Sequence, residues 1–447
     1  MSFLLRKTDI IAKFSIKSSN FAIKVIRIMD SSGVTININF AQQKISVEVN
    51  ENIDIIEDGI AQYNKGKVLK ELLTDHTRRQ LLREQKGHEE DDAYIIWATD
   101  DYKSYGDDYL FACEIKPELI TGENRNSIIM PRVLKDKVQQ VQRSKDKAEV
   151  FTPSWVCNAQ NNLIDEAWFG RKEVFNKEEV LKDGTHTWTP TEGNISFEGT
   201  GKTWEDYIRD TRMEITCGEA PYLVSRYDTT TGEEISLERR IGLLDRKMRV
   251  INENVKNLNE WKKWAKIAYH NIYGFEWQGD NLLLAREALF YTLLDYYEDV
   301  QKRLGMKPKK LHPSTMQSFA YIISWNIWQM DGLKFVIPET CKKVEVCTNQ
   351  KEIDAAMNDP FRQMFPEEAL PIPEPKYELQ ECPGCASGEH TKHTGIYSKI
   401  RDWGVFDNDH KDKEGKTGKE RCDRPFIEIY NETKNKRYYY ATDFHDF

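Results

Sequence analysis

The sequence lacks several features that would assign a protein to a class directly. No apolar run approaches the roughly 18 residues of a membrane-spanning helix, which disfavours a membrane partner. Residues 1–14 do not have the layout of a signal peptide, because charges interrupt their apolar part and no small-residue cleavage site follows. The 8 cysteines are scattered over 447 residues, which disfavours a disulfide framework. Together these absences predict a cytoplasmic protein.

An excess of positive charge is also missing. The formal net charge is −9, which argues against a surface coated in basic residues but leaves room for local basic patches. Three such patches are Lys65–Lys86, Arg132–Lys147 and Lys302–Lys310. Each suits contact with nucleic acid, but such charge runs are more common on ordinary solvated helix faces and linkers. The hydrophobic share of 39% and the charged share of 31% predict a folded globular chain.

Length and pattern divide the chain into three regions. At 447 residues it has room for two or three domains with buried cores. We expect an N-terminal α+β region at 1–110, an α/β domain at 111–340 and a C-terminal extension at 341–447. Two insertions are predicted in the middle region, because 171–202 is rich in Gly, Thr, Asn and Trp and 230–270 lengthens one connection.

The N-terminal region alternates between strand-like and helical patterns. Residues 21–28 and 34–40 alternate apolar and polar side chains around an Asp-Ser-Ser-Gly turn, which predicts a β-hairpin. Residues 52–86 are expected to be helical, because the stretch 67–83 places apolar side chains on one face. The apolar runs 93–97 and 109–115 predict two further strands.

Strands and helices alternate through the middle region, which is the pattern of a parallel α/β sheet. Thr152 or Ser154 can cap the first helix, and Thr203 and Asp280 should cap two later ones. The expected helices are 155–168, 204–210, one or two within 235–270, 282–303 and 314–323. The later expected strands are 272–277 and 325–328.

The loop after Glu214 is the most informative stretch of the chain. A strand-like approach ends at Glu214, a turn of small residues centred on Gly218 follows, and the apolar run after Ala220 predicts the start of a helix. A Rossmann-like sheet receives a nucleoside cofactor at such a place, because small residues let the backbone approach and the helix N-terminus faces the ligand. The next two strands also end near acidic residues. Glu276 after the second strand can accept the ribose hydroxyl hydrogens, and Asp331 after the third can hold the adenine amino group.

In these stretches the sequence resembles the adenine-specific DNA methyltransferases of bacterial restriction–modification systems, especially proteins described as restriction endonuclease subunit M. Ala148–Pro153 resembles the family's Gly-x-Phe/Tyr-x-Thr-Pro motif, and Glu214–Leu223 resembles its Asp-Pro-Ala-Cys-Gly-Ser-Gly-x-Phe-Leu loop. Tyr273–Arg286 and Asn326–Leu333 resemble the motifs of the second and third strands. The resemblance covers residues 110–335 and implies a Rossmann-like methyltransferase sheet that binds S-adenosylmethionine. The residues that it implies for cofactor binding are Phe151, Thr152, Pro153, Glu214, Thr216, Cys217, Gly218, Ala220, Glu276, Trp277 and Asp331.

The sequence departs from the family at three points, one of which is the long spacing from Gly218 to Glu276 that the insertion at 230–270 accounts for. Ala220 stands where the family's loop has a glycine, and Pro221 after it should stiffen the turn. The family's catalytic Asn/Asp/Ser-Pro-Pro-Tyr/Phe tetrapeptide, which accepts hydrogen bonds from the flipped adenine, does not occur in the sequence. Two imperfect candidates exist, and each also fits a surface loop: Asp359, Pro360 and Phe361, or Asp423, Pro425 and Phe426.

A short segment rich in cysteine and histidine carries the ligand types of a zinc site. Cys382 and Cys385 form a Cys-x2-Cys knuckle, and His390 and His393 follow. The two histidines are closer together than in the usual His-x3–5-His pattern. A polar loop with incidental thiols therefore stands as the alternative to zinc.

Three functions are open on the sequence. The leading expectation is an S-adenosylmethionine-dependent DNA adenine-N6 methyltransferase of a restriction–modification or phage-defence system. Its partners would be double-stranded DNA and a cognate restriction or specificity subunit. The first alternative is a catalytically degenerate methyltransferase-like subunit that binds cofactor or DNA as a sensor or scaffold. The second is a magnesium-dependent nuclease, because Asp107 or Asp108 with Glu114 and Lys116 imitates an Asp…Glu-x-Lys metal site.

Overall fold

The described part of the chain has a mixed α/β structure. The computed structural model describes residues 63–86, 92–122, 128–134, 152–367, 370–406 and 422–435, and four short strands before them. These strands form two antiparallel hairpins, β1 (Leu4–Lys7) with β2 (Ile10–Lys13) and β3 (Ile26–Met29) with β4 (Thr35–Ile38). The β3–β4 pair confirms the predicted hairpin. Among the described residues, no helix is both long and apolar enough to cross a membrane.

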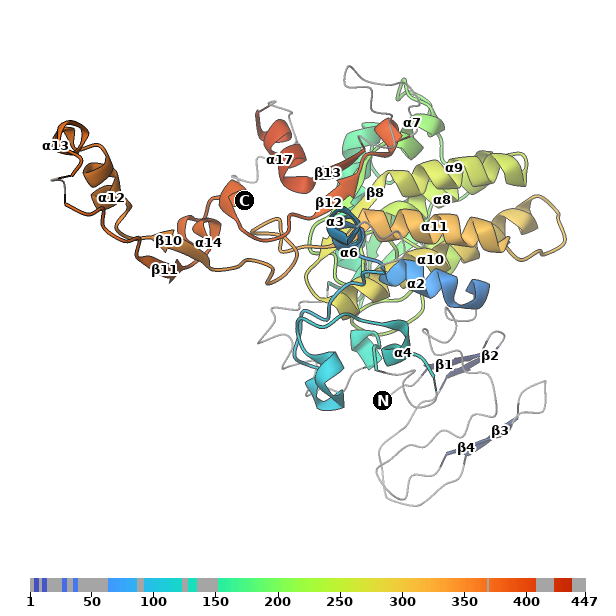
Figure 1. The fold of residues 1–447 in the computed structure, drawn as a ribbon. Coiled ribbons are helices and arrows are strands. Elements are labelled where there is room, and N and C mark those ends of the chain that lie inside the picture. Colours follow the sequence, from blue (N-terminus) through green and yellow to red (C-terminus); the bar gives the residue numbers. More distant parts are fainter. Residues whose placement is uncertain are drawn as a thin grey trace.

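A parallel sheet of three strands lies in the main body of the protein (Figure 1). Its strands stand in the order β7 (Arg212–Glu214), β8 (Ile272–Glu276), β9 (Ile327–Gln329). Gly274 in the central strand pairs with Glu214 on one side and with Ile327 on the other. The prediction of a parallel α/β sheet is confirmed for these three strands. Because the strands are parallel, their carboxyl ends meet at one edge.

Four helices form the connections between these strands and pack against one another (Figure 1). They are α8 (Leu243–Asn254), α9 (Leu258–His270), α10 (Gly279–Arg303) and α11 (Pro313–Asn326). Helix α9 begins where the side chain of Asn257 accepts hydrogen bonds from the backbone N–H groups of Asn259 and Glu260, at 3.1 and 3.0 Å. The main hydrophobic core lies among these helices and includes Ile272 and Ile327 of the sheet.

Helix α10 begins earlier than its sequence suggested. Asp280 lies inside its first turn, fully buried, and accepts a 2.7 Å hydrogen bond from the hydroxyl of Tyr102. The predicted cap at Asp280 is therefore wrong. The reason is the close packing of Gly279, where an added Cβ would lie 2.1 Å from the carbonyl oxygen of Ile96. The backbone of residues 96–98 thus closes the start of the helix.

The side chain of Arg286 fastens α10 to its surroundings. It is buried, and its guanidinium donates to four backbone carbonyl oxygens. Two of them, on Leu72 and Thr74, belong to the N-terminal region at 2.5 and 3.0 Å. The other two, on Ser324 and Ile327, belong to α11 and β9 at 3.0 and 2.7 Å. One side chain therefore joins three parts of the chain.

The N-terminal region differs from its predicted form. The helical stretch predicted over 52–86 contains two helices, α2 (Lys67–Leu73) and α3 (His76–Lys86), and residues 52–62 lie outside the described part of the chain. The strands predicted at 93–97 and 109–115 are wrong, because only isolated bridges occur there, Thr74 with Tyr94 and Ile96 with Glu114. The extended chain changes its hydrogen-bond partner from residue to residue, and the N–H of Ile96 donates to the side chain of Gln329 at 2.9 Å. No continuous ladder forms.

The other face of the sheet is covered by residues near the C-terminal end. Strands β12 (Lys399–Arg401) and β13 (Asp423–Pro425) pair antiparallel, and α17 (Phe426–Asn435) follows. Phe275 and Trp328 of the sheet share a second hydrophobic cluster with residues of this layer. The hydroxyl of Tyr273 also donates to the carbonyl oxygen of Arg401 at 3.2 Å. Part of the 341–447 region therefore belongs to the core around the sheet.

The region before the sheet contains the remaining longer elements. Helix α6 (Ser154–Phe169) confirms the predicted helix, and α7 (Trp204–Arg209) is capped by Thr203 as predicted. The segment predicted as an insertion at 171–202 holds a hairpin of β5 (Asn176–Val180) and β6 (His186–Pro190). The short elements are α4 (Pro117–Ile120), α14 (Pro383–Ser387), α15 (Trp403–Phe406) and the 3-10 helices η1 (Tyr63–Gly66), η2 (Lys103–Tyr105), η3 (Asp107–Tyr109), η4 (Arg132–Leu134), η5 (Leu237–Arg239) and η6 (His390–Lys392).

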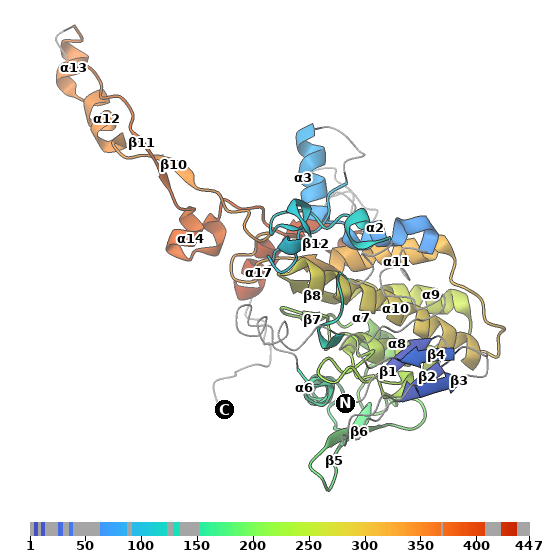
Figure 2. The same ribbon diagram turned by 90° about the horizontal axis from the view of Figure 1, so that it is seen from below.

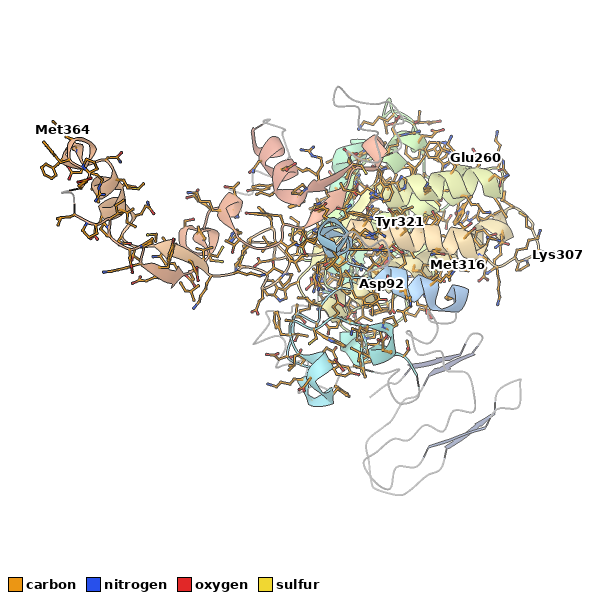
Figure 3. The ribbon with its side chains drawn as sticks, in the orientation of Figure 1. Asp92, Glu260, Lys307, Met316, Tyr321 and Met364 are labelled. Carbon is orange, nitrogen blue, oxygen red and sulfur yellow. The ribbon has the colours of Figure 1, made fainter. Side chains whose placement is uncertain are left out.

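A long arm projects from the main body, as the two perpendicular views show (Figures 1 and 2). We define the arm as residues 342–381. Its stem is the antiparallel pair β10 (Val344–Cys347) and β11 (Tyr377–Gln380), and its outer part holds α12 (Gln350–Met357) and α13 (Pro360–Met364). Figure 3 places Met364 at the far end of the arm and Tyr321 in the main body. The exposed apolar side chains of the arm are Met357, Phe361, Met364, Phe365, Leu370, Ile372, Tyr377 and Leu379.

Candidate functional site

The loop after β7 lies directly against β8. The N–H of Cys217 donates to the carbonyl oxygen of Phe275 at 2.8 Å, which continues the parallel pairing beyond the end of β7. Gly274 leaves room for this approach, since a Cβ there would lie 3.3 Å from the sulfur of Cys217. Cys217 is buried, and burial raises the pKa of its thiol well above the usual value. Its position agrees with the small turn residue expected from the sequence.

Three residues of this loop have backbone conformations in the left-handed region. The φ angles are 50° at Thr216, 53° at Gly218 and 61° at Ala220. Ala220 is the position at which the resemblance expects glycine, and its φ angle gives the physical reason for that expectation. A non-glycine residue in this conformation costs about 1–2 kcal/mol, and a β-branched residue such as Thr216 is a clear outlier there. Backbone strain is thus concentrated in the loop.

Glu276 brings the end of β8 to this loop. One carboxylate oxygen accepts the N–H of Gly218 at 2.9 Å, and the other accepts the N–H of Gln278 at 3.2 Å. The residue is only 8% exposed. Burial raises the pKa of Glu276, although its hydrogen bonds from the backbone oppose that shift. The structure therefore brings together Gly218 and Glu276, two residues that the sequence placed in one site.

Glu214 supports the loop from the other side. Its carboxylate accepts the N–H groups of Tyr222 and Leu223, at 3.5 and 3.2 Å. Burial raises the pKa of Glu214 well above its usual value, and the nearby Glu276 adds to the effect. Glu214 thus holds the turn that follows the loop, and its hydrogen bonds fix the backbone of that turn.

The helix predicted after the loop is interrupted. Only one turn forms, in which the N–H of Val224 donates to the carbonyl oxygen of Ala220 at 2.9 Å. The N–H groups of Leu243 and Leu244 then donate to the carbonyl oxygens of Tyr222 and Leu223, both at 2.8 Å, so α8 continues from this turn. Residues 225–242 are therefore an insertion between the first turn and the rest of a helix. The sequence had predicted an insertion further on, at 230–270.

Asp331 lies at the same edge of the sheet but serves its own turn. One carboxylate oxygen accepts the N–H groups of Leu333 and Lys334 at 2.9 and 3.1 Å, and the other lies 3.7 Å from the Lys334 ammonium. Trp277 is fixed from the N-terminal region, because its indole N–H donates to the carbonyl oxygen of Ala98 at 3.1 Å. These contacts position both residues without a ligand.

The first motif of the resemblance is described in part. Phe151 lies outside the described residues. The carbonyl oxygen of Thr152 accepts a hydrogen bond from the hydroxyl of Thr229 at 3.1 Å, and Pro153 is the N-cap of α6. The cap expected from Thr152 or Ser154 is wrong, because the N–H of Ser154 donates to Asp228 at 2.8 Å. The insertion at 225–242 therefore supplies this cap.

Acidic groups dominate the electrostatics at this edge. Glu214, Glu276 and Asp280 are all buried, and among the described residues neither Glu214 nor Glu276 forms an ion pair with a lysine or arginine. The charge of Glu276 raises the pKa of Glu214, and the charge of Asp280 raises the pKa of Glu276. Each carboxylate therefore disfavours the ionisation of the next. A cation bound among them would relieve that repulsion.

Neither candidate for the catalytic tetrapeptide is placed at this loop. Asp359, Pro360 and Phe361 lie in the outer part of the arm, away from the sheet (Figure 1). Asp423 forms two hydrogen-bonded contacts with Arg401 at 2.6 Å each. Pro425 pairs with Lys399 in the strand ladder, and Phe426 packs on Phe275 and Trp328, with ring centroids 6.3 and 5.6 Å apart. Both groups already serve other parts of the fold.

The residues of the proposed nuclease site do not lie on a strand. Asp107 and Asp108 are exposed in η3, and Lys116 is exposed before α4. Glu114 forms an ion pair with Arg78 at 3.0 Å. Among the described residues, the metal-ligand types converge in only one group, which excludes these carboxylates. The geometry gives the nuclease hypothesis no support.

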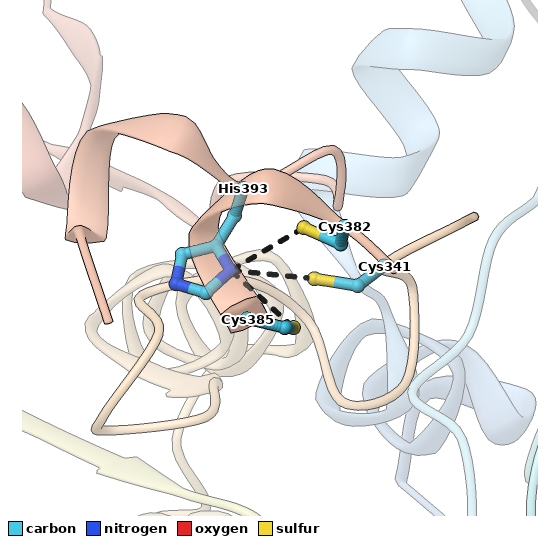
Figure 4. Close-up of side chains that lie close together, drawn as sticks. All are labelled: Cys341, Cys382, Cys385 and His393. Atoms are coloured by element: carbon cyan, nitrogen blue, oxygen red, sulfur yellow. Dashed lines mark hydrogen bonds between the residues drawn. The ribbon is translucent and has the colours of Figure 1, made fainter. Parts of the chain in front are cut away.

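That group consists of Cys341, Cys382, Cys385 and His393, whose ligand atoms all lie within 4.8 Å of one another (Figure 4). Three of the four predicted ligands are present. His390 is not among them, because its ring packs on Phe335 with centroids 4.9 Å apart. Cys341 replaces it from the other end of the arm. No local spacing in the sequence could have linked Cys341 to this group.

Comparison with known proteins adds no family assignment. No protein family, no curated protein and no solved structure matches this chain.

Proposed function

We propose that this protein binds S-adenosylmethionine at the carboxyl edge of its parallel sheet and acts in adenine-N6 DNA modification. The observation that carries the proposal is the contact between Glu276 and the N–H of Gly218 at 2.9 Å, at the edge where β7 and β8 end. An acidic side chain beside a loop of small residues is the arrangement that binds the ribose of a nucleoside cofactor. We also propose that this sheet is that of a Rossmann-like methyltransferase.

The charge of the site favours this cofactor over a phosphate-bearing one. Glu214, Glu276 and Asp280 are buried near one another, and a pyrophosphate would add negative charge to them. S-adenosylmethionine instead carries a sulfonium and an ammonium group. Buried carboxylates stabilise such cations, because the local dielectric constant is low.

The residues of the chain would divide the work of binding. The carboxylate of Glu276 has lone pairs beyond those that accept the N–H groups of Gly218 and Gln278, and these can accept ribose hydroxyl groups. Glu214 holds the turn after the loop, and Trp277 is fixed by Ala98. When bound, the cofactor supplies an electrophilic methyl group for transfer to the amino group of an adenine. The chain contributes orientation and proximity.

Calorimetric titration with S-adenosylmethionine tests the proposal. We expect the wild-type protein to bind and Glu276→Ala to bind at least about tenfold more weakly, because it loses the acceptors for two hydroxyl groups. Glu198→Ala, an exposed carboxylate in the 171–202 segment, is the control and should bind as the wild type does. Absence of binding by the wild type would refute the proposal, as would undiminished binding by Glu276→Ala.

A second candidate function is a cofactor-binding subunit that does not itself transfer the methyl group. The positions of the two tetrapeptide candidates favour it, since one lies on the arm and the other packs beside the sheet. In addition, no described strand pairs with the outer edge of β7, where Met213 and Ile215 are 38% and 68% exposed. Such a subunit would need a cognate restriction or specificity subunit for its activity.

A methyl-transfer assay separates the two functions. The protein is incubated with labelled S-adenosylmethionine and adenine-containing double-stranded DNA, and label in the DNA is counted. Transfer that Glu276→Ala abolishes supports the methyltransferase. Cofactor binding without transfer supports the non-catalytic subunit.

A further inference from the structure

Three sulfur atoms converge on a single ring nitrogen at the base of the arm (Figure 4). The sulfur atoms of Cys341, Cys382 and Cys385 lie 3.6, 3.7 and 3.7 Å from Nδ1 of His393. One imidazole nitrogen donates or accepts one hydrogen bond, so hydrogen bonding explains at most one of these contacts. Zinc with Zn–S of about 2.3 Å and Zn–N of about 2.0 Å in a tetrahedron places sulfur and nitrogen about 3.5 Å apart. All three distances lie close to that value.

Two glycines make this convergence sterically possible. A Cβ on Gly384 would lie 2.6 Å from the backbone nitrogen of His393 and 2.7 Å from its ring. A Cβ on Gly395 would lie 3.1 Å from the sulfur of Cys341. The backbone therefore approaches the cluster from two sides, at positions where a Cβ would crowd a ligand.

Hydrogen bonds around the cluster hold the ligand-bearing segments in place. The N–H of Thr394 donates to the sulfur of Cys382 at 3.2 Å. The hydroxyl of Tyr397 accepts the N–H of His393 at 3.0 Å and donates to the carbonyl oxygen of His390 at 2.7 Å. The Thr394 hydroxyl also exchanges two hydrogen bonds with the backbone of Lys342, at 2.8 and 2.9 Å. Supporting contacts of this kind fix the orientation of metal ligands.

We propose that Cys341, Cys382, Cys385 and His393 hold one zinc ion that closes the base of the arm. Three thiolates and one imidazole are soft ligands that suit zinc, and a cation removes the repulsion between the thiolates. Four protein ligands fill a tetrahedron, so the ion has a structural role. The site is independent of the cofactor proposed at Gly218.

The position of the ligands explains what the ion would do. Cys341 immediately precedes the arm and Cys382 immediately follows it, so the whole of 342–381 leaves and returns at one metal ion. Among the described residues of the arm, Ile353 is the only buried apolar side chain, and many of the others are exposed. Closing a long loop at its ends removes conformational freedom that such a segment could not remove by packing.

Metal analysis of the purified full-length protein tests the site. Inductively coupled plasma mass spectrometry should find about one zinc ion per chain, and Cys341→Ser and His393→Ala should each lower the zinc content at least tenfold. Replacing zinc by cobalt should give the visible absorption of a tetrahedral, thiolate-bound ion in the wild type. A wild type that neither contains zinc nor takes up cobalt in this form would overturn the proposal.

Three further variants separate loss of a ligand from general misfolding. His390→Ala removes the histidine that lies outside the cluster, and Cys347→Ser removes an arm cysteine that contacts Asn349 instead. Both should keep their zinc. His393→Cys supplies a fourth thiolate and should restore the zinc that His393→Ala loses. Loss of zinc in His390→Ala with retention in His393→Ala would contradict the assignment.

Limited proteolysis reports the structural role directly. Removal of the metal with a chelator should increase cleavage within 342–381 at least tenfold, because opening the base of the arm exposes its backbone. Cleavage within 243–303 should change little, since α8, α9 and α10 lie in the main core. Equal cleavage of the arm with and without chelator would show that no ion closes it.

Discussion

Glu287 in α10 should make the stability of this protein fall as pH rises. The side chain is 1% exposed, and none of the described residues donates a hydrogen bond to either of its carboxylate oxygens. Burial raises its pKa from 4.5 to about 8. Below pH 4.5 the folded and unfolded states both carry the proton, whereas between these pKa values only the folded state keeps it. The unfolded state then binds fewer protons, so the free energy of unfolding falls with pH and levels off above about 8.

The size of the effect follows from the difference between the two pKa values. At about 1.4 kcal/mol per pH unit, the full shift amounts to about 5 kcal/mol, and about 3 kcal/mol of it falls between pH 5 and pH 7.5. Glu287→Gln stays neutral at every pH and removes this dependence. The variant should therefore gain about 3 kcal/mol relative to the wild type across that range.

Urea unfolding of both proteins at a series of pH values measures this difference, in which the titration of all other groups cancels. Glu298→Gln on the same helix is the control, because Glu298 is 61% exposed in a surface ion pair with Lys302. Its difference from the wild type should be nearly flat. If the Glu287→Gln difference is also independent of pH, the buried carboxyl does not behave as its environment requires, and the argument fails.

Three further outcomes are expected. Thr216→Gly removes the backbone strain of an exposed β-branched residue at a φ of 50°. The free energy of unfolding in urea should therefore increase by about 1 kcal/mol, and a decrease would contradict the strain argument. Arg286→Met leaves four backbone carbonyl oxygens without their donor and should lower the free energy of unfolding by about 3–5 kcal/mol. The control Arg303→Met, at the exposed end of α10, should lower it by less than about 1 kcal/mol. Affinity for S-adenosylmethionine should increase with pH more steeply than affinity for S-adenosylhomocysteine, which lacks the sulfonium charge. The raised pKa values of Glu214 and Glu276 mean that these carboxyl groups gain their negative charge at a higher pH than ordinary glutamates do, and equal slopes in calorimetry would count against the acidic site.

Local patterns in the sequence predicted the sheet and its helices well. The apolar stretch 272–277 predicted β8, and the capping residue Thr203 predicted the start of α7, because both signals depend only on neighbouring residues. The apolar runs 93–97 and 109–115 gave wrong strand predictions, because the pattern of neighbouring residues does not show what a segment pairs with. Their side chains are buried as in a strand. The backbone N–H and C=O of Ile96, however, form hydrogen bonds with the side chain of Gln329 and not with the backbone of a neighbouring strand. That substitution comes from β9, far along the chain.

The candidate sites show the same limit. The sequence placed Gly218 and Glu276 in one site because parallel strands end at a common edge, and the structure joins them by a hydrogen bond. It did not reveal that α8 continues from the turn at Ala220, because the inserted residues 225–242 separate hydrogen-bonded neighbours. Cys341 was missed for an equivalent reason, since the whole arm separates it from Cys382.

The two ends of the arm meet at one small cluster, and this makes the arm exchangeable. The cluster holds Cys341 and Cys382 close together, so the segment between them always starts and ends at the same place. A longer or shorter segment would therefore leave the sheet and its helices undisturbed. The added cost of closing a longer loop grows only slowly with its length. The protein therefore offers a natural grafting point, at which a foreign peptide or small domain could replace the arm and be displayed well away from the main body.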